Sequence, residues 1–194
     1  MTELGITAEQ GLVYEDLLPL KWHLDTETSL LDKGKFDALN EEVLRFIEVL
    51  DEHPSESVIE HSPINQELAK VEVKFDLLLS LVNQLLGVYF PLPDPVPVKL
   101  TSNGVQWVSN SPINLGASGQ VEIYLSRRCP RSLIFPARVD SLEKEGRGYL
   151  ISAQFGEFGS AIKERLEKMI FRQHRRSVAS ARRKLASNQS AQAS

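Results

Sequence analysis

Cysteine is almost missing from this 194-residue chain, which contains Cys129 and no other. A single cysteine excludes an internal disulfide framework and favours a reducing compartment. Long apolar runs are missing too, because a segment such as LLLSLV at 77–82 is far shorter than the roughly 18 residues of a membrane helix. The opening residues MTELGITAEQ lack the basic and apolar regions of a signal peptide. We therefore expect a soluble cytoplasmic protein.

Basic residues are scarce in the first half of the chain and acidic residues in the second, although the net charge is only −4. Residues 1–98 contain 19 acidic and 6 basic residues, which gives −13, whereas residues 99–194 contain 7 acidic and 16 basic residues, which gives +9. Apolar residues make up 42% of the chain, so disorder throughout is excluded. The division predicts two different surfaces, and two partners could use them.

Two helices are predicted in the acidic half. Apolar residues step by three and four along 35–51, and Pro54 follows this segment. A heptad pattern runs along 64–86, preceded by Ser62 and Pro63 and followed by Gly87. The pattern consists of Ile64, Leu68, Val71, Phe75, Leu78, Val82 and Leu85, and it is widened by Leu77, Leu79, Leu81 and Leu86. Both helices could simply cover a sheet, but so wide an apolar face favours self-association through a helix bundle.

The rest of the chain predicts short strands and a final helix. Alternating apolar residues indicate strands near 17–24, 104–109, 120–126, 131–143 (interrupted at Pro136) and 149–155. The proline-rich segment YFPLPDPVPVKL before them is interpreted as a stiff, extended connector. These closely spaced strands predict an antiparallel barrel or sandwich. A helix is expected from about 158 to 185, followed by a disordered tail.

Catalytic and metal-binding patterns are also missing. The chain has no Walker loop and no GxGxxG that opens a helix. None of His23, His53, His61 and His174 forms a paired metal-ligand spacing, so we expect no metal. Arginines 127 and 128 could lower the pKa of Cys129, but the sequence shows no base and no orienting group, so a loop cysteine beside surface charge is the strongly favoured interpretation. We therefore expect no catalytic residues and no enzyme activity.

The basic half resembles a PilZ domain. The similarity covers roughly 96–172, from KLTSNGVQWVS through VEIYLS, LIFPARVDSLE and the EGRG hairpin to YLISAQF and a helix. The heptad helices placed before it, and the early segment LPLKW, resemble the atypical, tetramer-forming PilZ subgroup. The resemblance implies a six-stranded antiparallel barrel of the α+β class with an inserted helical hairpin. It also implies a receptor or adaptor for cyclic di-GMP.

The PilZ ligand motif combines an RxxxR segment with [DN]xSxxG, and this chain departs from both parts. Lys99 replaces the acidic or amide residue, Thr101 replaces serine, Asn103 lies within the motif and Gly104 matches. No arginine lies between Arg45 and Arg127, so the planar, bidentate group that suits phosphate is absent before the motif. Binding by the family's usual mode is therefore doubtful.

Basic residues instead gather in the last predicted helix. They are Arg172, Arg175, Arg176, Arg182, Arg183 and Lys184. This segment could be a solvated helix end, an anion site beside the barrel, or a docking site for an acidic protein. Nucleic-acid or membrane-surface contact is disfavoured by the overall acidity and the lack of interleaved aromatic residues.

Together these patterns predict a domain order and a function. A strand-bearing segment at 1–30 joins the barrel, 31–90 forms a helical oligomerisation module, 91–185 forms the barrel with its helix, and 186–194 is a disordered tail. We expect a homo-oligomer, a tetramer by resemblance, that acts as a non-enzymatic adaptor with an unidentified protein partner. The alternative is a cyclic di-GMP receptor whose site uses the C-terminal arginines. No other cofactor is expected.

Overall fold

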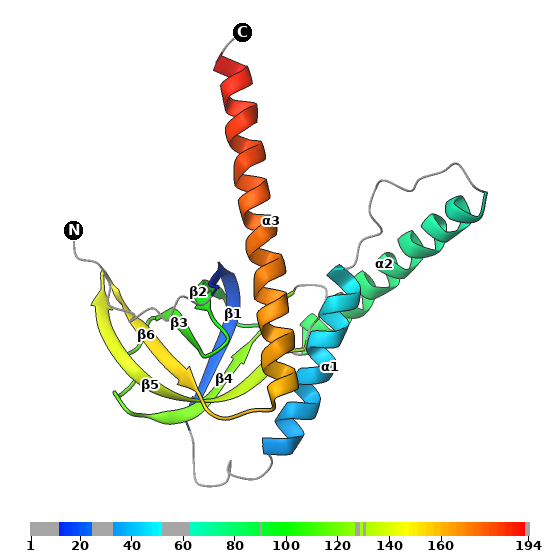
Figure 1. Ribbon diagram of the computed structural model, residues 1–194. Helices are drawn as coiled ribbons and strands as arrows, with labels where there is room; N and C mark the ends of the chain where they lie inside the picture. The colour runs from blue at the N-terminus through cyan, green and yellow to red at the C-terminus, as the bar shows by residue number, and fades with distance from the viewer. Residues whose placement is uncertain are drawn as a thin grey trace.

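The computed structural model describes residues 12–24, 33–51, 63–89, 91–126, 129 and 131–192. In chain order the elements are β1 (Tyr14–Leu24), α1 (Lys33–Asp51), α2 (Pro63–Tyr89), β2 (Pro95–Leu100), β3 (Gly104–Ser109), β4 (Ser118–Ile123), β5 (Leu133–Glu145), β6 (Gly148–Phe155) and α3 (Ser160–Gln192). The strands gather in one body, α1 and α3 lie along one side of it, and α2 extends outward (Figure 1).

The strands form a closed antiparallel barrel in the order β1-β2-β3-β6-β5-β4. Strand β1 closes it by changing partners along its length. Its first part, as far as Pro19, pairs with β2, and the part from Leu20 onward pairs with β4. The six-stranded antiparallel barrel expected from the sequence is thus confirmed.

Alternating side chains fill the barrel, as period two predicts for strands with one buried face. Along β5 the buried positions are Leu133, Phe135, Ala137 and Val139. The ring of Phe135 stacks on Phe155 of β6, with centroids 4.4 Å apart. A second stacked pair, Trp22 and Trp107, joins β1 to β3 at 5.9 Å. The phenylalanine pair joins the two strands of one hairpin, whereas the tryptophan pair fixes two strands that are distant in sequence against one another.

The prolines lie where the sheet does not need their missing N–H. Residues 95–100 form strand β2 rather than an extended connector, and Pro95 and Pro97 pair only with β1, because pairing with β3 begins at Val98. Strand β5 likewise continues through Pro136 instead of stopping there, since pairing with β6 begins one residue later, at Ala137. Proline is tolerated at such edge positions.

Helix α1 is part of the barrel's core. Its buried face consists of Val43, Leu44 and Ile47, and it packs against β5 and α3. The buried amide of Asn40 donates to the backbone oxygen of Ile134 (2.7 Å) and accepts from the backbone N–H of the same residue (2.8 Å). The amide thereby pairs the backbone N–H and carbonyl of Ile134, which lies on the part of β5 that is not paired with β6. The predicted 31–90 module therefore divides, and α1 belongs structurally with the barrel.

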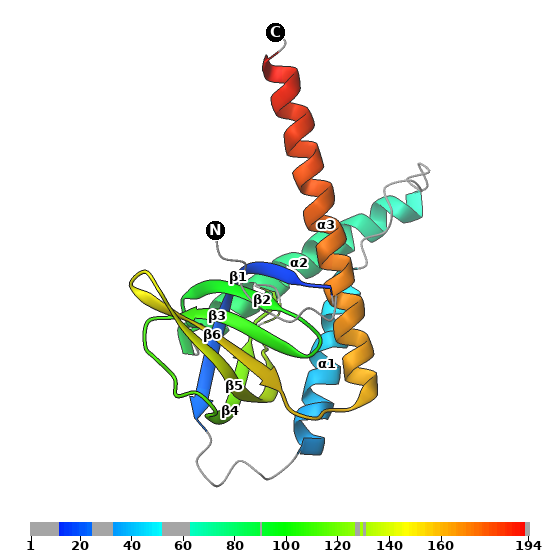
Figure 2. The same ribbon diagram turned by 60° about the vertical axis from the view of Figure 1, so that its left-hand side comes forward.

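Helix α3 begins against this core and then leaves it. Among the side chains of α3 that the structure describes, which end at Arg176, the buried ones are Ile162, Leu166, Met169 and Ile170. Figures 1 and 2 both show this part beside α1, whereas the remainder projects away from the barrel. The helix continues to Gln192, so residues 186–192 are helical rather than the expected disordered tail. The segment contains no glycine or proline that would stop a helix.

Candidate functional site

The residues of the altered ligand motif form the turn between β2 and β3. The Thr101 hydroxyl accepts the backbone N–H of Gly104 at 3.0 Å and that of Asn103 at 3.3 Å, and it donates to the Gly104 carbonyl at 3.1 Å. The backbone N–H of Thr101 donates to the same carbonyl at 3.0 Å. The hydroxyl that would replace the family's serine is thus engaged within the turn.

Gly104 has a steric reason to be glycine. A Cβ atom added there would lie 2.6 Å from the backbone oxygen of Ala153 on β6. The preceding carbonyl, of Asn103, accepts the backbone N–H of Phe155 at 2.9 Å. The backbone of the turn therefore lies directly against β6. The matching glycine permits this close approach of two backbones, because it has no Cβ.

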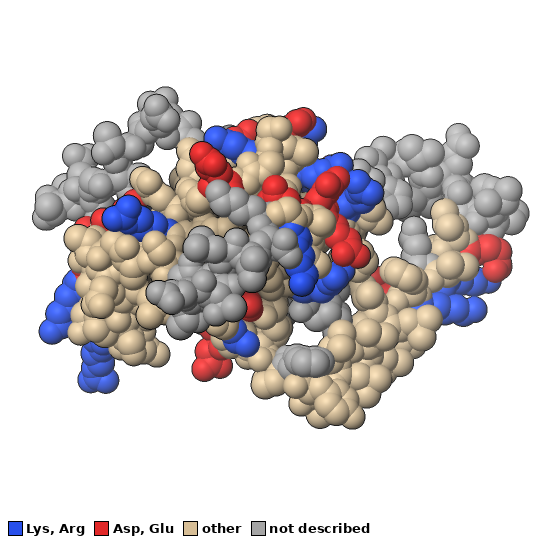
Figure 3. All heavy atoms as spheres, turned by 90° about the horizontal axis from the view of Figure 1, so that it is seen from below, with Lys and Arg blue, Asp and Glu red and all other residues tan. Residues whose placement is uncertain are grey.

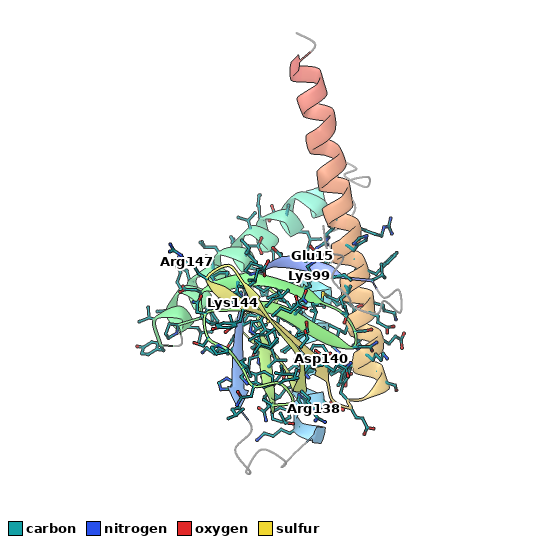
Figure 4. The ribbon with its side chains drawn as sticks, turned by 90° about the vertical axis from the view of Figure 1, so that its left-hand side faces the viewer. Glu15, Lys99, Arg138, Asp140, Lys144 and Arg147 are labelled. Carbon is teal, nitrogen blue, oxygen red and sulfur yellow. The ribbon has the colours of Figure 1, made fainter. Side chains whose placement is uncertain are left out.

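Lys99 lies on the outer surface of the barrel beside an acidic neighbour. Its Nζ lies 3.2 Å from Oε1 of Glu15, the residue directly opposite on β1, and both side chains are largely exposed. Figure 4 shows the two residues together on the barrel face. The ammonium group that would have to replace the family's acidic or amide residue is thus already paired with a carboxylate.

Arg165 and Arg172 of α3 contact α1, and Arg175 contacts a ring of its own helix. Oε1 of Glu48 on α1 lies 3.7 Å from Arg172, and its other oxygen lies 2.9 Å from Arg165. The Nε of Arg172 is buried without a hydrogen-bond partner. The guanidinium of Arg175 lies 5.7 Å from the centroid of the Phe171 ring. Arg176 is exposed, and residues 182–184 lie on the projecting part of α3.

The barrel also presents basic residues that motif reasoning did not single out. Arg138 lies on β5, and Lys144 and Arg147 flank the tip of the β5–β6 hairpin. Figure 4 shows the hairpin pair at one end of the barrel and Arg138 at the other, with Asp140 between them along β5. All four side chains are exposed. Arg138, Asp140 and Lys144 share strand β5, and Arg147 lies in the turn that joins it to β6.

The lone cysteine is a core residue rather than a surface thiol. Cys129 is buried, and desolvation raises its pKa, although its hydrogen bond to the Arg131 backbone opposes the shift. Cys129 does lie in a connection between strands, as the simple interpretation has it, but it is buried there, and the expectation of a lowered thiol pKa is wrong. Arginines 127 and 128 lie outside the described residues, as do His53 and His61.

In the described part of the chain, no group of three or more His, Cys, Asp or Glu side chains lies close enough to hold a metal ion. His23 instead contacts Glu122, with Nε2 3.3 Å from Oε1. None of the helices in the same residues is both long enough and apolar enough to cross a membrane.

The predicted oligomer seam lies exposed along α2. At the six seam positions whose side chains are described, the residues are between 49% and 64% exposed. They are Leu68, Val71, Phe75, Leu78, Val82 and Leu85. Ile64 begins the same face, but its side chain lies outside the described set. Apolar patches of this length on one helix indicate an interface rather than a free surface.

Comparison with known proteins gives the family. The sequence profile described as "Atypical PilZ domain, cyclic di-GMP receptor" matches residues 44–183. The chain belongs to this family. No curated protein matches the sequence of this atypical PilZ chain.

A solved structure has the same fold as this atypical PilZ chain. It is a pathogenic protein from Xanthomonas campestris, described as a tetrameric PilZ domain that self-assembles through an unusual helical bundle. The TM-score is 0.68 at 23% sequence identity, and the match covers 89% of this chain and 93% of the other. At this identity the likeness establishes the fold, including the helices that accompany the barrel.

Proposed function

We propose that this atypical PilZ chain is a non-enzymatic, oligomeric adaptor in cyclic di-GMP-linked signalling, and that it acts mainly through protein contacts. The observation that carries the proposal is the state of the motif turn. The Thr101 hydroxyl is engaged by the turn, and Lys99 is paired with Glu15. No arginine segment precedes them to supply the planar group that phosphate recognition favours. Control of motility or surface behaviour is the process that the family resemblance suggests.

Self-assembly is the second element of the proposal. The exposed seam of α2 would be covered by α2 helices of other copies, and a tetramer is the state we favour. Helix α1 supplies no cover of its own, because its apolar face is already buried against β5 and α3. The neighbouring tetrameric PilZ structure, with its helical bundle, supports this assignment by likeness of fold.

The projecting part of α3 is the proposed docking element. From residue 169 to the end the sequence contains five arginines, one lysine and no acidic residue. A helix that carries this charge away from the barrel is suited to an acidic protein surface, where guanidinium groups form bidentate contacts with carboxylates. Arg175 and Arg176 are the exposed arginines that we assign to this contact.

The second candidate function is direct reception of cyclic di-GMP through α3. One observation favours it: the Nε of Arg172 is buried and has no hydrogen-bond partner, although Glu48 lies beside the guanidinium. A phosphate group could complete that hydrogen bonding. Arg172 and Arg175 would then contact the ligand.

One titration separates the two candidates. The adaptor proposal expects no heat when the full chain is titrated with cyclic di-GMP to high micromolar concentration. Saturable heat that disappears in Arg172→Ala would instead establish the receptor.

A pulldown then tests the docking helix. Arg175→Glu/Arg176→Glu should release a captured partner, whereas Lys163→Glu/Lys168→Glu changes the charge of the same helix equally, near its packed end, and should retain it. Retention of the same partner by both variants would contradict docking through the projecting part of α3.

A further inference from the structure

Helix α3 packs against an acidic helix along its first part only. Helix α1, its neighbour there, contains five acidic and three basic residues. The carboxylate oxygens of Glu48 on α1 lie 2.9 Å from Nη1 of Arg165 and 3.7 Å from Nη1 of Arg172. Helix α1 ends at Asp51, whereas α3 continues to Gln192, about 30 Å beyond Arg172 at the usual helical rise. No described element runs beside this projecting part (Figures 1 and 2), so it lacks the neighbour that the packed part has.

The projecting part carries an apolar residue at every seventh position. The first is Phe171, which is 45% exposed although it directly follows the buried Ile170. Val178 and Leu185 follow at intervals of seven. Positions seven apart drift by only about 20° around a helix, so these three positions lie on one face, which we call the α3 stripe. The heptad positions beside them on the same face are small or polar, and they are His174, Ala181 and Asn188. A narrow stripe of this kind accommodates one further helix.

Arginines flank the α3 stripe in both of its first two heptads. Arg175 and Arg182 come four positions after Phe171 and Val178, which is where charged residues flank the seam of a coiled coil. The guanidinium of Arg175 lies 5.7 Å from the centroid of the Phe171 ring, so this arginine lies beside the first residue of the stripe. The sequence contains no acidic residue from position 169 onward. On the face of the molecule shown in Figure 3, by contrast, basic and acidic side chains are intermixed, so the single sign of charge along α3 is not general to the surface.

An acidic helix with its own apolar stripe is the occupant that this surface fits. Its apolar side chains would cover the α3 stripe, and its carboxylates would meet Arg175 and Arg182, since charges at these positions determine which helices pair. A second α3 helix does not fit, because each copy would bring arginines and no carboxylate to the contact. The packed part of α3 supports the choice, because α1 meets it with apolar residues and with the carboxylate of Glu48.

We propose that the projecting part of α3 forms a two-stranded coiled coil with an acidic heptad helix of another protein. The α3 stripe forms the seam of this contact, and Arg175 and Arg182 select the partner. The inference rests on the docking role proposed for α3, and it narrows the contact to one side of the helix. Arg176 and Arg183 lie one position further along, on the side away from the stripe, and are left outside the contact.

Titration of the full chain with a synthetic peptide tests the proposal. The probe has three heptads, with leucine at the a and d positions and glutamate at the e and g positions, and fluorescence anisotropy measures its binding. Saturable binding is expected at about 0.15 M salt, and a peptide of the same composition in scrambled order should bind about tenfold more weakly or worse. Arg175→Gln/Arg182→Gln should weaken binding about tenfold, because two charge-assisted contacts beside the seam are lost. Arg176→Gln/Arg183→Gln, the matched control, removes the same two charges from the opposite side and should change binding less than about twofold.

The α3 stripe is tested with the same probe. Val178→Ser/Leu185→Ser should weaken binding about a hundredfold, because two apolar side chains are lost from the seam. Ala179→Ser/Ala186→Ser, on the outer side of the helix, makes two similar changes and should retain binding. Far-ultraviolet dichroism should show the same helix content for both variants and the wild type.

Several results would overturn the proposal. Equal binding of the ordered and scrambled peptides, or equal weakening by the two arginine pairs, overturns the coiled coil and leaves docking by charge standing. No binding of either peptide overturns the acidic helix as partner, while the pulldown above decides separately whether α3 docks at all. Tighter binding of a duplex oligonucleotide than of the glutamate peptide would assign the surface to nucleic acid instead.

Discussion

Helices α1 and α2 follow one another in sequence and show the same apolar period, but they use it differently. The apolar face of α1, with Val43, Leu44 and Ile47, is buried inside the chain. The face of α2 is at least half exposed at most of its apolar positions. Periodicity therefore shows that a helix has a partner surface, and it does not show whether the partner is the same chain or another copy.

The difference has a visible cause in the polar residues. Helix α1 places Asn40 in its buried face, where the amide completes the hydrogen bonding of Ile134. A buried amide with both partners fixes a helix in one position on a sheet edge. Helix α2 has no such anchor among its described side chains, and its apolar residues extend to two faces. The buried amide of Asn40 thus distinguishes the docked helix α1 from the exposed helix α2.

The largest expected effect is on stability, from a cavity in α1. Ile47→Ala should lower the free energy of unfolding by about 2–5 kcal/mol, because the buried side chain leaves a space that its neighbours fill only partly. Leu78→Ala in α2 should weaken association and leave the unfolding of the barrel nearly unchanged. Denaturant unfolding of each variant measures the difference. Val49→Ala, an exposed position of α1, is the control and should change neither property.

The second effect tests the anchor itself. Asn40→Ala removes the partner of both backbone groups of Ile134, and a buried polar group left unpaired costs about 1–3 kcal/mol. Stability should fall, and amide hydrogen exchange at Ile134 should accelerate before that of the rest of β5. Equal acceleration along the whole strand would mean that the amide stabilises the barrel only globally.

Much of this contrast could be predicted from sequence, and the missing part has physical reasons. Alternation predicted four strands after the linker and the one at 17–24, and the heptads predicted α2. The strand at 95–100 was missed, because proline is a poor strand former and only the edge position of Pro95 and Pro97 makes it tolerable. The apolar period of α1 left open whether this helix covers a sheet or packs in a bundle, because a period does not specify the partner. The burial of Cys129 was not predicted.

The candidate site was predicted only as a set of positions. The motif positions were recognised from their spacing, but the spacing could not show that Thr101 closes its own turn. Nor could it show that Lys99 faces Glu15, since the two residues are 84 positions apart and meet only through the β1–β2 register. Contacts between distant strands depend on register, which one sequence leaves open.

The third effect extends the comparison to the motif turn, which is satisfied within the chain as α1 is. Gly104→Ala should destabilise the protein by about 1–3 kcal/mol, because the added Cβ would meet the Ala153 carbonyl and force the backbones of β3 and β6 apart. Thermal unfolding measures the loss. Gly146→Asn, at a hairpin position with φ of 57°, is the control, since nothing lies near its Cβ and asparagine tolerates this conformation.

The smallest effect concerns the charges that hold α1 to α3. Glu48→Gln removes a carboxylate shared by Arg165 and Arg172, which are about one-third exposed, so the loss should be about 1 kcal/mol or less. The loss should shrink as salt is added, because partly exposed pairs are screened. Glu42→Gln, which breaks the more exposed contact with Arg131, should have a still smaller effect. If the two substitutions proved equally harmful and insensitive to salt, packing of the side chains rather than their charge would hold α1 against α3, and the contrast with α2 would rest on shape alone.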